Sequence, residues 1–384
     1  MTKKKLNEIS RLLNGYAFKS SKYVQSGLRV IRIANVQDGY LSDSEPCFYP
    51  IETTTELEQF LLKPHDLLMS LTGNVGRVAF IEKEYLPAGL NQRVECIRPF
   101  NESDKEYLYY FFRSPIFQRE SLKASHGSAQ LNLSTVWLAN FYVVYPDEEK
   151  RKTAVNTLRT IDNLIREKRN QLIELDSLIK SRFMEMFGNY FEDSRYFVKV
   201  GDIATATIGL TYKPNNVADE GIIVLRSGNI KNAELCLSDD IVRVSNIKIK
   251  EDKFVRENDI LMCSRNGSAR LIGKCCLIPK LNEQMSYGAF MTVIRSKCPY
   301  FLNGFFNSSY FLQQLTGTQT ASVNQITTGM LNGYTVIKPR DAEESEFAKF
   351  CKLVDKSRFV VQKEIKDLQE LLDSKMDEYF GGEE

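Results

Sequence analysis

The chain has 384 residues, of which 43% are hydrophobic and 26% are charged, and its formal net charge is +2. This length exceeds what one hydrophobic core usually organises, so two or more domains are expected. The absence of any run of 18 apolar residues, and of an apolar stretch behind the basic start, argues against a transmembrane span and a signal peptide.

Cysteine and histidine usage points to a reduced protein without a metal centre. The eight cysteines show no paired spacing apart from the adjacent Cys275 and Cys276. In a chain of this length that pattern is typical of free thiols in a cytoplasmic protein. His65 and His126 are the only histidines, so a His/Cys metal cluster is not expected.

Residues 1–146 have the pattern of a mixed domain. Apolar runs at 27–33, 66–70 and 77–81 have the length and composition of strands, and the last two flank a glycine-containing turn. Residues 106–117 are aromatic with a helical pattern, and residues 141–146 predict a final strand. We therefore expect an α+β domain, largely β, of ordinary domain size.

Residues 147–188 predict one long central helix. Its apolar positions recur in steps of three and four, Asp147 after Pro146 is a suitable N-cap, and Gly188 is a suitable stop. About 35 helical residues would span about 50 Å. A helix of this length needs a partner of similar length.

The remainder of the chain repeats this arrangement. Residues 6–9 align with 200–203 at an offset of 194, and residues 66–69 align with 259–262 at an offset of 193. The offset of 193 persists into a second long helix that follows Pro339. The sequence thus predicts a globular domain at 1–146, a helix at 147–188, a second globular domain at 189–340, and a second helix with an acidic tail at 341–384.

Two apolar stripes of matched length suggest that the long helices pack on each other. A duplicated chain has pseudo-twofold symmetry, which makes the pairing antiparallel, and the three–four spacing fits a coiled-coil seam. Lys168, Arg182, Arg358 and Lys375 also fall at seam positions, where we interpret them as snorkelling side chains that fix the register. The apolar seam residues are Leu158, Ile161, Leu172, Leu175, Ile179, Val354, Ile365, Leu368 and Leu372.

We find no catalytic constellation in the sequence. It contains neither a phosphate-binding loop nor a complete G-x-G-x-x-G motif. Asp147 and Lys150 resemble a nuclease motif only superficially, because an aspartate at a helix start is explained as a cap. His126 has no carboxylate beside it to orient its ring.

Polar loop residues instead recur at matching places in both copies. Arginine suits guanine edges, asparagine and glutamine suit adenine, and lysine suits phosphates, so these loops are candidate nucleic-acid contacts. In the first copy the candidate DNA-binding residues are Lys19, Thr72, Asn74, Arg77, Asn91, Gln92, Arg93, Ser128, Gln130 and Asn132. In the second copy they are Lys213, Ser264, Arg265, Asn266, Ser268, Arg270, Lys274, Tyr287, Ser322, Asn324 and Gln325.

These features together resemble the specificity subunits of type I restriction–modification enzymes over essentially the whole chain. The matching segments are Val200-Gly201-Asp202-Ile203, the run from Gly209 to Pro214, Asn258-Asp259-Ile260-Leu261, the run from Gly127 to Ser134, and the two proline-led helices that end in Phe-Gly. The duplicated architecture is the most specific part of this resemblance.

The resemblance implies two target recognition domains separated by two spacer helices that pair as an antiparallel coiled coil. It further implies a non-catalytic subunit that reads a bipartite, asymmetric site on double-stranded DNA, with one domain per half-site. Two methyltransferase subunits and restriction/translocase subunits would dock on it. S-adenosylmethionine, ATP and Mg would then belong to those partners, with no cofactor in this chain.

Two other functions remain open from the residues themselves. One is a duplicated coiled-coil scaffold that binds protein ligands. The other is a nuclease with a cryptic site, which would show magnesium-dependent cleavage by the chain alone.

Overall fold

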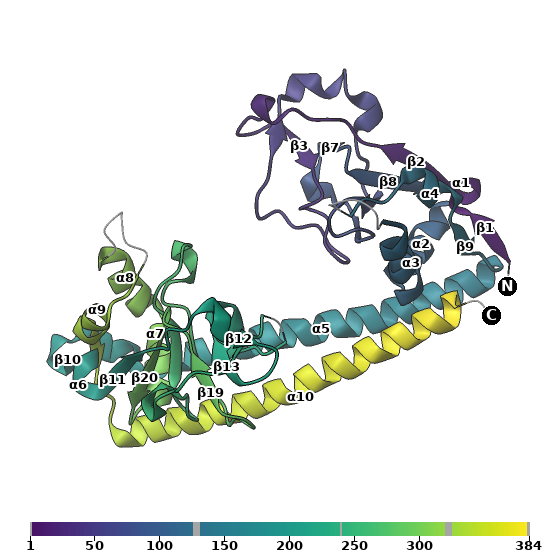
Figure 1. Ribbon diagram of the computed structural model, residues 1–384. Helices are drawn as coiled ribbons and strands as arrows, with labels where there is room; N and C mark the ends of the chain where they lie inside the picture. The colour runs from purple at the N-terminus through teal and green to yellow at the C-terminus, as the bar shows by residue number, and fades with distance from the viewer. Residues whose placement is uncertain (1, 126–130, 239, 319–324, 382–384) are drawn as a thin grey trace. The chain divides into compact units, whose positions relative to one another are not determined.

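The computed structural model describes residues 2–125, 131–238, 240–318 and 325–381. The chain forms two compact units. Unit 1 consists of Met1–Arg169 with Lys363–Glu384, and unit 2 is Asn170–Gln362. Each unit contains one globular domain and one half of each long helix, and both chain ends belong to unit 1 (Figure 1).

Unit 1 is built on a four-stranded antiparallel sheet. Its strand order is β2 (Ser10–Asn14), β8 (Val94–Pro99), β5 (Leu67–Ser70) and β6 (Val78–Phe80). A three-stranded sheet has the order β4 (Phe48–Tyr49), β3 (Leu28–Ile31) and β7 (Ala88–Leu90), in which β3 and β7 are parallel. A two-stranded sheet pairs β1 (Lys3–Lys5) with β9 (Tyr142–Val144).

Helices cover one face of the four-stranded sheet of unit 1. They are α1 (Leu6–Ile9), α2 (Lys105–Arg113), α3 (Pro115–Ser125) and α4 (Thr135–Asn140). Leu67, Met69 and Ile97 share one hydrophobic core with the aromatic residues of α2 and α3. The single helix predicted at 106–117 is therefore two helices. The reason is Pro115, which keeps Ser114 extended (ψ 147°) and ends α2 there.

Unit 2 repeats this topology. Its four-stranded sheet has the order β11 (Ala204–Ile208), β20 (Met291–Ser296), β17 (Ile260–Cys263) and β18 (Cys275–Leu277). The second sheet has the order β12 (Val217–Ala218), β16 (Arg243–Val244), β13 (Ile222–Leu225) and β19 (Met285–Tyr287), with β13 and β19 parallel.

The smaller elements of unit 2 also have counterparts. A two-stranded sheet pairs β10 (Phe197–Lys199) with β21 (Thr335–Ile337), and β14 (Ile230–Lys231) pairs with β15 (Glu234–Leu235). Its short helices are α6 (Val200–Ile203), α7 (Pro299–Phe306), α8 (Ser309–Thr318) and α9 (Thr328–Gly333). The duplication inferred from the sequence is thus a duplication of fold.

The two long helices are α5 (Glu148–Phe187) and α10 (Asp341–Phe380). The Asp147 carboxylate accepts a hydrogen bond from the Lys150 backbone N–H (3.0 Å), which confirms the predicted N-cap. In unit 1, Leu158 and Ile161 of α5 share a core with Leu372 and Phe380 of α10.

Pairs of residues within each unit establish the direction of packing. In unit 1, Lys168 of α5 lies 2.7 Å from Glu364 of α10. In unit 2, Arg182 of α5 pairs with Glu346 of α10, further back along that helix. Within unit 1, Thr157 of α5 contacts Tyr379 of α10, and within unit 2, Asp176 of α5 contacts Arg358 of α10. In each unit the residue numbers therefore fall on α10 as they rise on α5, and the prediction of an antiparallel pair is confirmed.

The seam differs from the expectation at one basic residue. Arg358 is not a snorkelling side chain: only 12% of it is exposed, and it is held by the carboxylates of Asp176, Glu234 and Asp355 at 2.5 to 2.7 Å. Three carboxylates replace the hydration that a buried guanidinium loses, which makes this position an ionic lock inside unit 2.

Candidate nucleic-acid interface

In unit 1 the predicted loop residues meet at one end of the four-stranded sheet. Backbone hydrogen bonds join Leu71 to Arg93 and Leu133 to Leu71, which brings three loops side by side. Thr72 is only 7% exposed, so its prediction as a DNA contact is wrong, and its hydroxyl instead donates to Asn132 Oδ1 (2.9 Å). Thr72, Gln92, Arg93 and Asn132, with Leu71, line a cavity of about 320 Å³. Donors and acceptors of the kind that read base edges are therefore concentrated at this end of the sheet.

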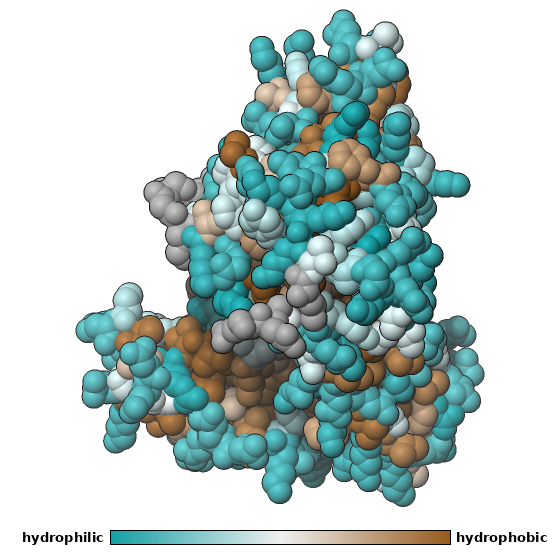
Figure 2. All heavy atoms as spheres, turned by 90° about the vertical axis from the view of Figure 1, so that its right-hand side faces the viewer, coloured by the Kyte–Doolittle hydropathy of each residue, from teal (hydrophilic) through white to brown (hydrophobic). Residues whose placement is uncertain are grey.

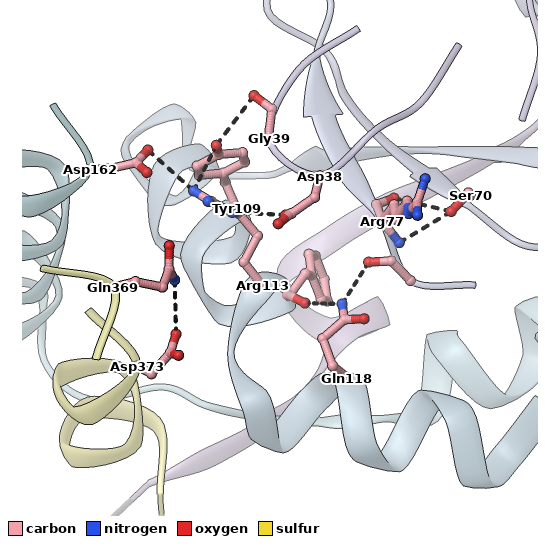
Figure 3. A network of polar contacts seen from close by, with 12 residues as sticks. Asp38, Gly39, Ser70, Arg77, Tyr109, Arg113, Gln118, Asp162, Gln369 and Asp373 are labelled. Atoms are coloured by element: carbon pink, nitrogen blue, oxygen red, sulfur yellow. Dashed lines mark hydrogen bonds and ion pairs between the residues drawn. The ribbon is translucent and has the colours of Figure 1, made fainter. Parts of the chain in front are cut away.

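Helix α3 contacts the loop that carries Arg77 and holds it in place. Gln118 of α3 donates to the Gly76 carbonyl (2.8 Å), and the Arg77 backbone N–H donates to Ser70 Oγ (Figure 3). The Arg77 guanidinium donates to Gln37 (2.7 Å). Arg77 thus has an intramolecular partner, and in this conformation part of its guanidinium is not available to a ligand.

Unit 2 builds the equivalent site with different side chains. Arg265 donates to the Gln325 side-chain oxygen through Nε (2.9 Å) and through Nη2. These two residues occupy the places of Thr72 and Asn132, which form the same isolated bridge between loops in unit 1. Phe290 occupies the place of Arg93, and its ring is 58% exposed.

Phe290 is the functional candidate that sequence reasoning missed. The internal repeat could have indicated this residue. Phe290 directly precedes β20, and Arg93 directly precedes the equivalent strand β8 in the first copy. Polar composition does not indicate this position, because phenylalanine has no hydrogen-bonding side chain.

Two predicted contacts in unit 2 are wrong. Tyr287 is completely buried on β19, and burial raises the pKa of its hydroxyl to about 12. Ser264 is 6% exposed, and its hydroxyl donates to the Phe290 carbonyl (3.1 Å) and accepts from Thr292 (2.9 Å). Both positions lie at strand ends, where the sheet covers them, so they support the site without facing a ligand.

The other predicted residues vary in how accessible they are. Asn266 accepts from the Ser268 backbone N–H within its own loop and donates to Ser227 Oγ (3.1 Å), so it connects this loop to the segment around Ser227. The residues with exposed side chains are Lys19, Asn74, Gln92, Arg93, Asn132, Lys213, Arg265 and Arg270. Partly exposed are Asn91, Ser268, Lys274 and Gln325. Ser128, Gln130, Ser322 and Asn324 lie outside the described residues.

In each unit an arginine ties the globular domain to a long helix. In unit 1, Arg113 of α2 contacts Asp38 in a turn of the domain and Asp162 of α5, both at 3.2 Å, and donates to the Tyr109 hydroxyl (Figure 3). In unit 2 the corresponding role falls to Arg358 of α10, which contacts Glu234 beside the β14–β15 turn. Both locks hold the domain in a fixed orientation on its own helix.

Glu95 is a buried carboxylate on the sheet of unit 1. It stands opposite Asn14 and Met69 in the register of β2 and β5. Its side chain is 0% exposed, and within the described part of the chain neither oxygen has a hydrogen-bond partner. Burial raises its pKa from 4.5 to about 7. In unit 2 the same register position is Thr292, whose hydroxyl is satisfied by Ser264.

We predict that Glu95→Gln flattens the pH dependence of unit 1 stability. The pKa of Glu95 is higher in the folded state than in the unfolded state. Between pH 4.5 and about 7, the folded state therefore keeps a proton on Glu95 that the unfolded state has lost. The free energy of unfolding decreases as the pH rises through this window. At 1.36 kcal/mol per pKa unit, the loss amounts to about 3 kcal/mol. Denaturant unfolding at pH 5, 6, 7 and 8 measures it.

The control for this prediction is Glu84→Gln, because Glu84 is an exposed residue of the same unit. Burial also raises the pKa of Glu344 in unit 2 to about 7, so the comparison is between variant and wild type at each pH. Equal pH slopes for Glu95→Gln and wild type would contradict the prediction.

The described residues contain no group of three or more histidine, cysteine, aspartate and glutamate side chains placed to hold a metal ion. Among the helices that the structure describes, none combines the length and apolar character needed to cross a membrane.

The fold of this chain is similar to that of a solved structure. Over 99% of the chain, it is similar to the S subunit of a type I restriction–modification system from M. genitalium, with a TM-score of 0.51, 14% sequence identity and 96% of that subunit covered. This chain thus shares the fold of that subunit.

Sequence comparison agrees with the structural match. Residues 1–175 match the family model described as type I restriction modification DNA specificity domain. The chain is therefore similar in sequence to specificity subunits of type I restriction–modification systems, and residues 1–175 match the domain of that family.

Two curated relatives show the extent of the similarity. The MjaVIII specificity subunit of Methanocaldococcus jannaschii is 29% identical over 181 residues, which are 46% of this chain and 43% of that protein. The EcoKI specificity subunit of Escherichia coli is 20% identical over 305 residues, or 73% of this chain and 64% of that protein. The matches thus span less than two thirds of either relative.

Proposed function

We propose that this chain is the DNA-reading subunit of a type I restriction–modification enzyme. Each unit reads one half of a bipartite, asymmetric site on double-stranded DNA. The observation that carries the proposal is the pair of equivalent loop clusters. Thr72, Arg93 and Asn132 in unit 1 stand where Arg265, Phe290 and Gln325 stand in unit 2.

The chemistry of the two clusters explains why the half-sites would differ. The frameworks share their strand order and register, so the loops present side chains from the same positions. Arginine pairs with guanine, asparagine and glutamine pair with adenine, and a phenylalanine can contact the thymine methyl group. Exposed lysines such as Lys19 and Lys213 supply phosphate contacts that position the duplex without reading it.

The chemical steps would belong to partner subunits. Two methyltransferase subunits would supply S-adenosylmethionine-dependent methylation, and restriction subunits would supply ATP- and Mg-dependent cleavage and translocation, leaving this chain non-catalytic. Support for docking comes from large apolar side chains exposed on the long helices, namely Ile173, Leu178, Leu353, Phe359 and Leu371. On the face drawn in Figure 2, hydrophobic side chains likewise appear among a hydrophilic majority.

A titration of duplex DNA with the chain and its methyltransferase partner tests the proposal. The affinity should fall as salt rises, with a slope of about 0.9 in log–log form for each phosphate neutralised. Binding that does not depend on salt would contradict DNA recognition and favour a protein-binding scaffold. Cleavage by the chain alone with magnesium would instead indicate a nuclease.

We further predict that the helical pair determines the spacing of the two half-sites. Inserting seven residues after Arg169 and seven before Lys363 preserves the seam and adds about 10 Å of helix. At about 3.4 Å per base pair, the nonspecific gap should lengthen by about three base pairs. Modification-sensitive sequencing of the host genome measures the gap.

The control for this insertion adds the seven residues to α5 only. This shifts the apolar stripe of α5 relative to that of α10 and should abolish methylation. An unchanged gap after the double insertion would show that the helices do not act as the spacer.

A further inference from the structure

The exposed ring of Phe290 lies beside the guanidinium of Arg265. The guanidinium carbon is 6.0 Å from the ring centroid, within the range of a cation–π contact. A phenylalanine that is 58% exposed contributes little to the core. Its position beside the candidate base-reading side chains makes Phe290 a candidate contact for a ligand with an apolar group.

Three hydrogen bonds hold the backbone carbonyl of Phe290 in place. The Phe290 carbonyl accepts hydrogen bonds from the backbone N–H groups of Ser264 and Arg265, both at 3.0 Å, and from the Ser264 hydroxyl. The buried Thr292 hydroxyl donates in turn to Ser264. The ring is thus presented from a braced turn, where its position costs little to maintain on binding.

Arg265 is oriented by the same group of residues. Its Nε and Nη2 atoms donate to Gln325 Oε1, which fixes the plane of the guanidinium. The edge formed by Nη1 and the second Nη2 hydrogen remains for two acceptors, which is the arrangement needed for guanine O6 and N7. The neighbouring apolar feature of the major groove is the C5-methyl group of thymine.

We propose that Phe290 reads a thymine methyl group at the base pair next to a guanine read by Arg265. The half-site of unit 2 then contains a thymine and a guanine at adjacent base pairs. This inference rests on the proposed function and deepens it. Unit 1 has no such reader at this place, because Arg93 stands where Phe290 stands in unit 2.

The test uses the full chain in complex with its methyltransferase partner. Genome-wide methylation first gives the recognised motif. Each thymine of the unit 2 half-site is then replaced by deoxyuridine, which lacks only the methyl group and keeps every hydrogen bond. For wild type, one such replacement beside a guanine should weaken binding by about fourfold, the equivalent of one buried methyl-sized group.

Variants then assign the effect to the ring. For Phe290→Ala, thymine and deoxyuridine duplexes should bind equally, whereas Phe290→Leu should keep part of the preference. Phe100→Ala is the matched control, since Phe100 is a 66% exposed phenylalanine of unit 1, and it should retain the wild-type discrimination.

Two results would overturn the inference while leaving the proposed function intact. One is specific binding to a motif whose unit 2 half-site has no thymine beside a guanine. The other is equal binding of thymine and deoxyuridine duplexes by the wild-type complex at every position. That result is expected if the ring only inserts between base pairs. Loss of preference for the motif over random DNA in the wild-type complex would overturn the proposed function itself.

Discussion

Under the proposed function, exchanging residues 1–146 for the corresponding segment of a type I specificity subunit is expected to change one half-site of the recognised DNA completely and leave the other unchanged. The reason is that the loop cluster around Thr72 and Arg93 is built entirely within this segment. The cluster around Arg265 is built entirely within unit 2. The methylated motif of cells that carry the hybrid protein measures the outcome.

The reciprocal hybrid, with residues 189–340 exchanged, is the control and should alter the opposite half-site. The donor segment must keep acidic and basic partners for the helix, because Asp104 and Arg113 of the exchanged segment contact Arg151 and Asp162 of α5. A hybrid that folds yet changes both half-sites would contradict one domain per half-site.

The second large effect is expected from Arg151→Met. Arg151 is 7% exposed, stands in the first turns of α5, and lies 2.9 Å from Asp104, whose side chain is 2% exposed. Removing the guanidinium leaves a buried carboxylate with the Tyr145 hydroxyl as its side-chain donor (2.6 Å). Breaking a buried ion pair in this way typically costs about 3 to 5 kcal/mol.

Chemical denaturation of the variant measures the free energy of unfolding of unit 1. Lys150→Met is the matched control, because Lys150 pairs with Asp147 at the exposed surface, and it should change stability by less than about 0.5 kcal/mol. Adding Asp104→Asn to Arg151→Met should recover part of the loss by removing the stranded charge. Equal effects of Arg151→Met and Lys150→Met would show that this ion pair does not stabilise the domain.

Much of the architecture could be predicted from the sequence because its signals are local. Capping residues and the three–four apolar spacing define α5 and α10, and both helices begin within one residue of the expected positions. Because the chain contains an internal repeat, an element predicted in one half could also be expected at the equivalent position in the other half. The separate helices α2 and α3 were missed, although Pro115 was a local signal for their boundary.

The candidate site was only partly predictable. The loops around Thr72, Asn132, Arg265 and Gln325 were identified from their polar composition, and the structure brings each pair together. Tyr287 and Phe290, three residues apart, show the limit of that approach. The first was expected to face a ligand and is buried, and the second was not considered and is exposed.

The sequence by itself determined the duplication, the long helices and the placement of polar loops, because these depend on spacing along the chain. The tertiary structure decided which side chains of those loops face outward. Tyr287 is buried because β13, more than 60 residues earlier in the chain, pairs with its strand. Burial depends on strands and helices that arrive from distant parts of the chain, so local composition does not determine it.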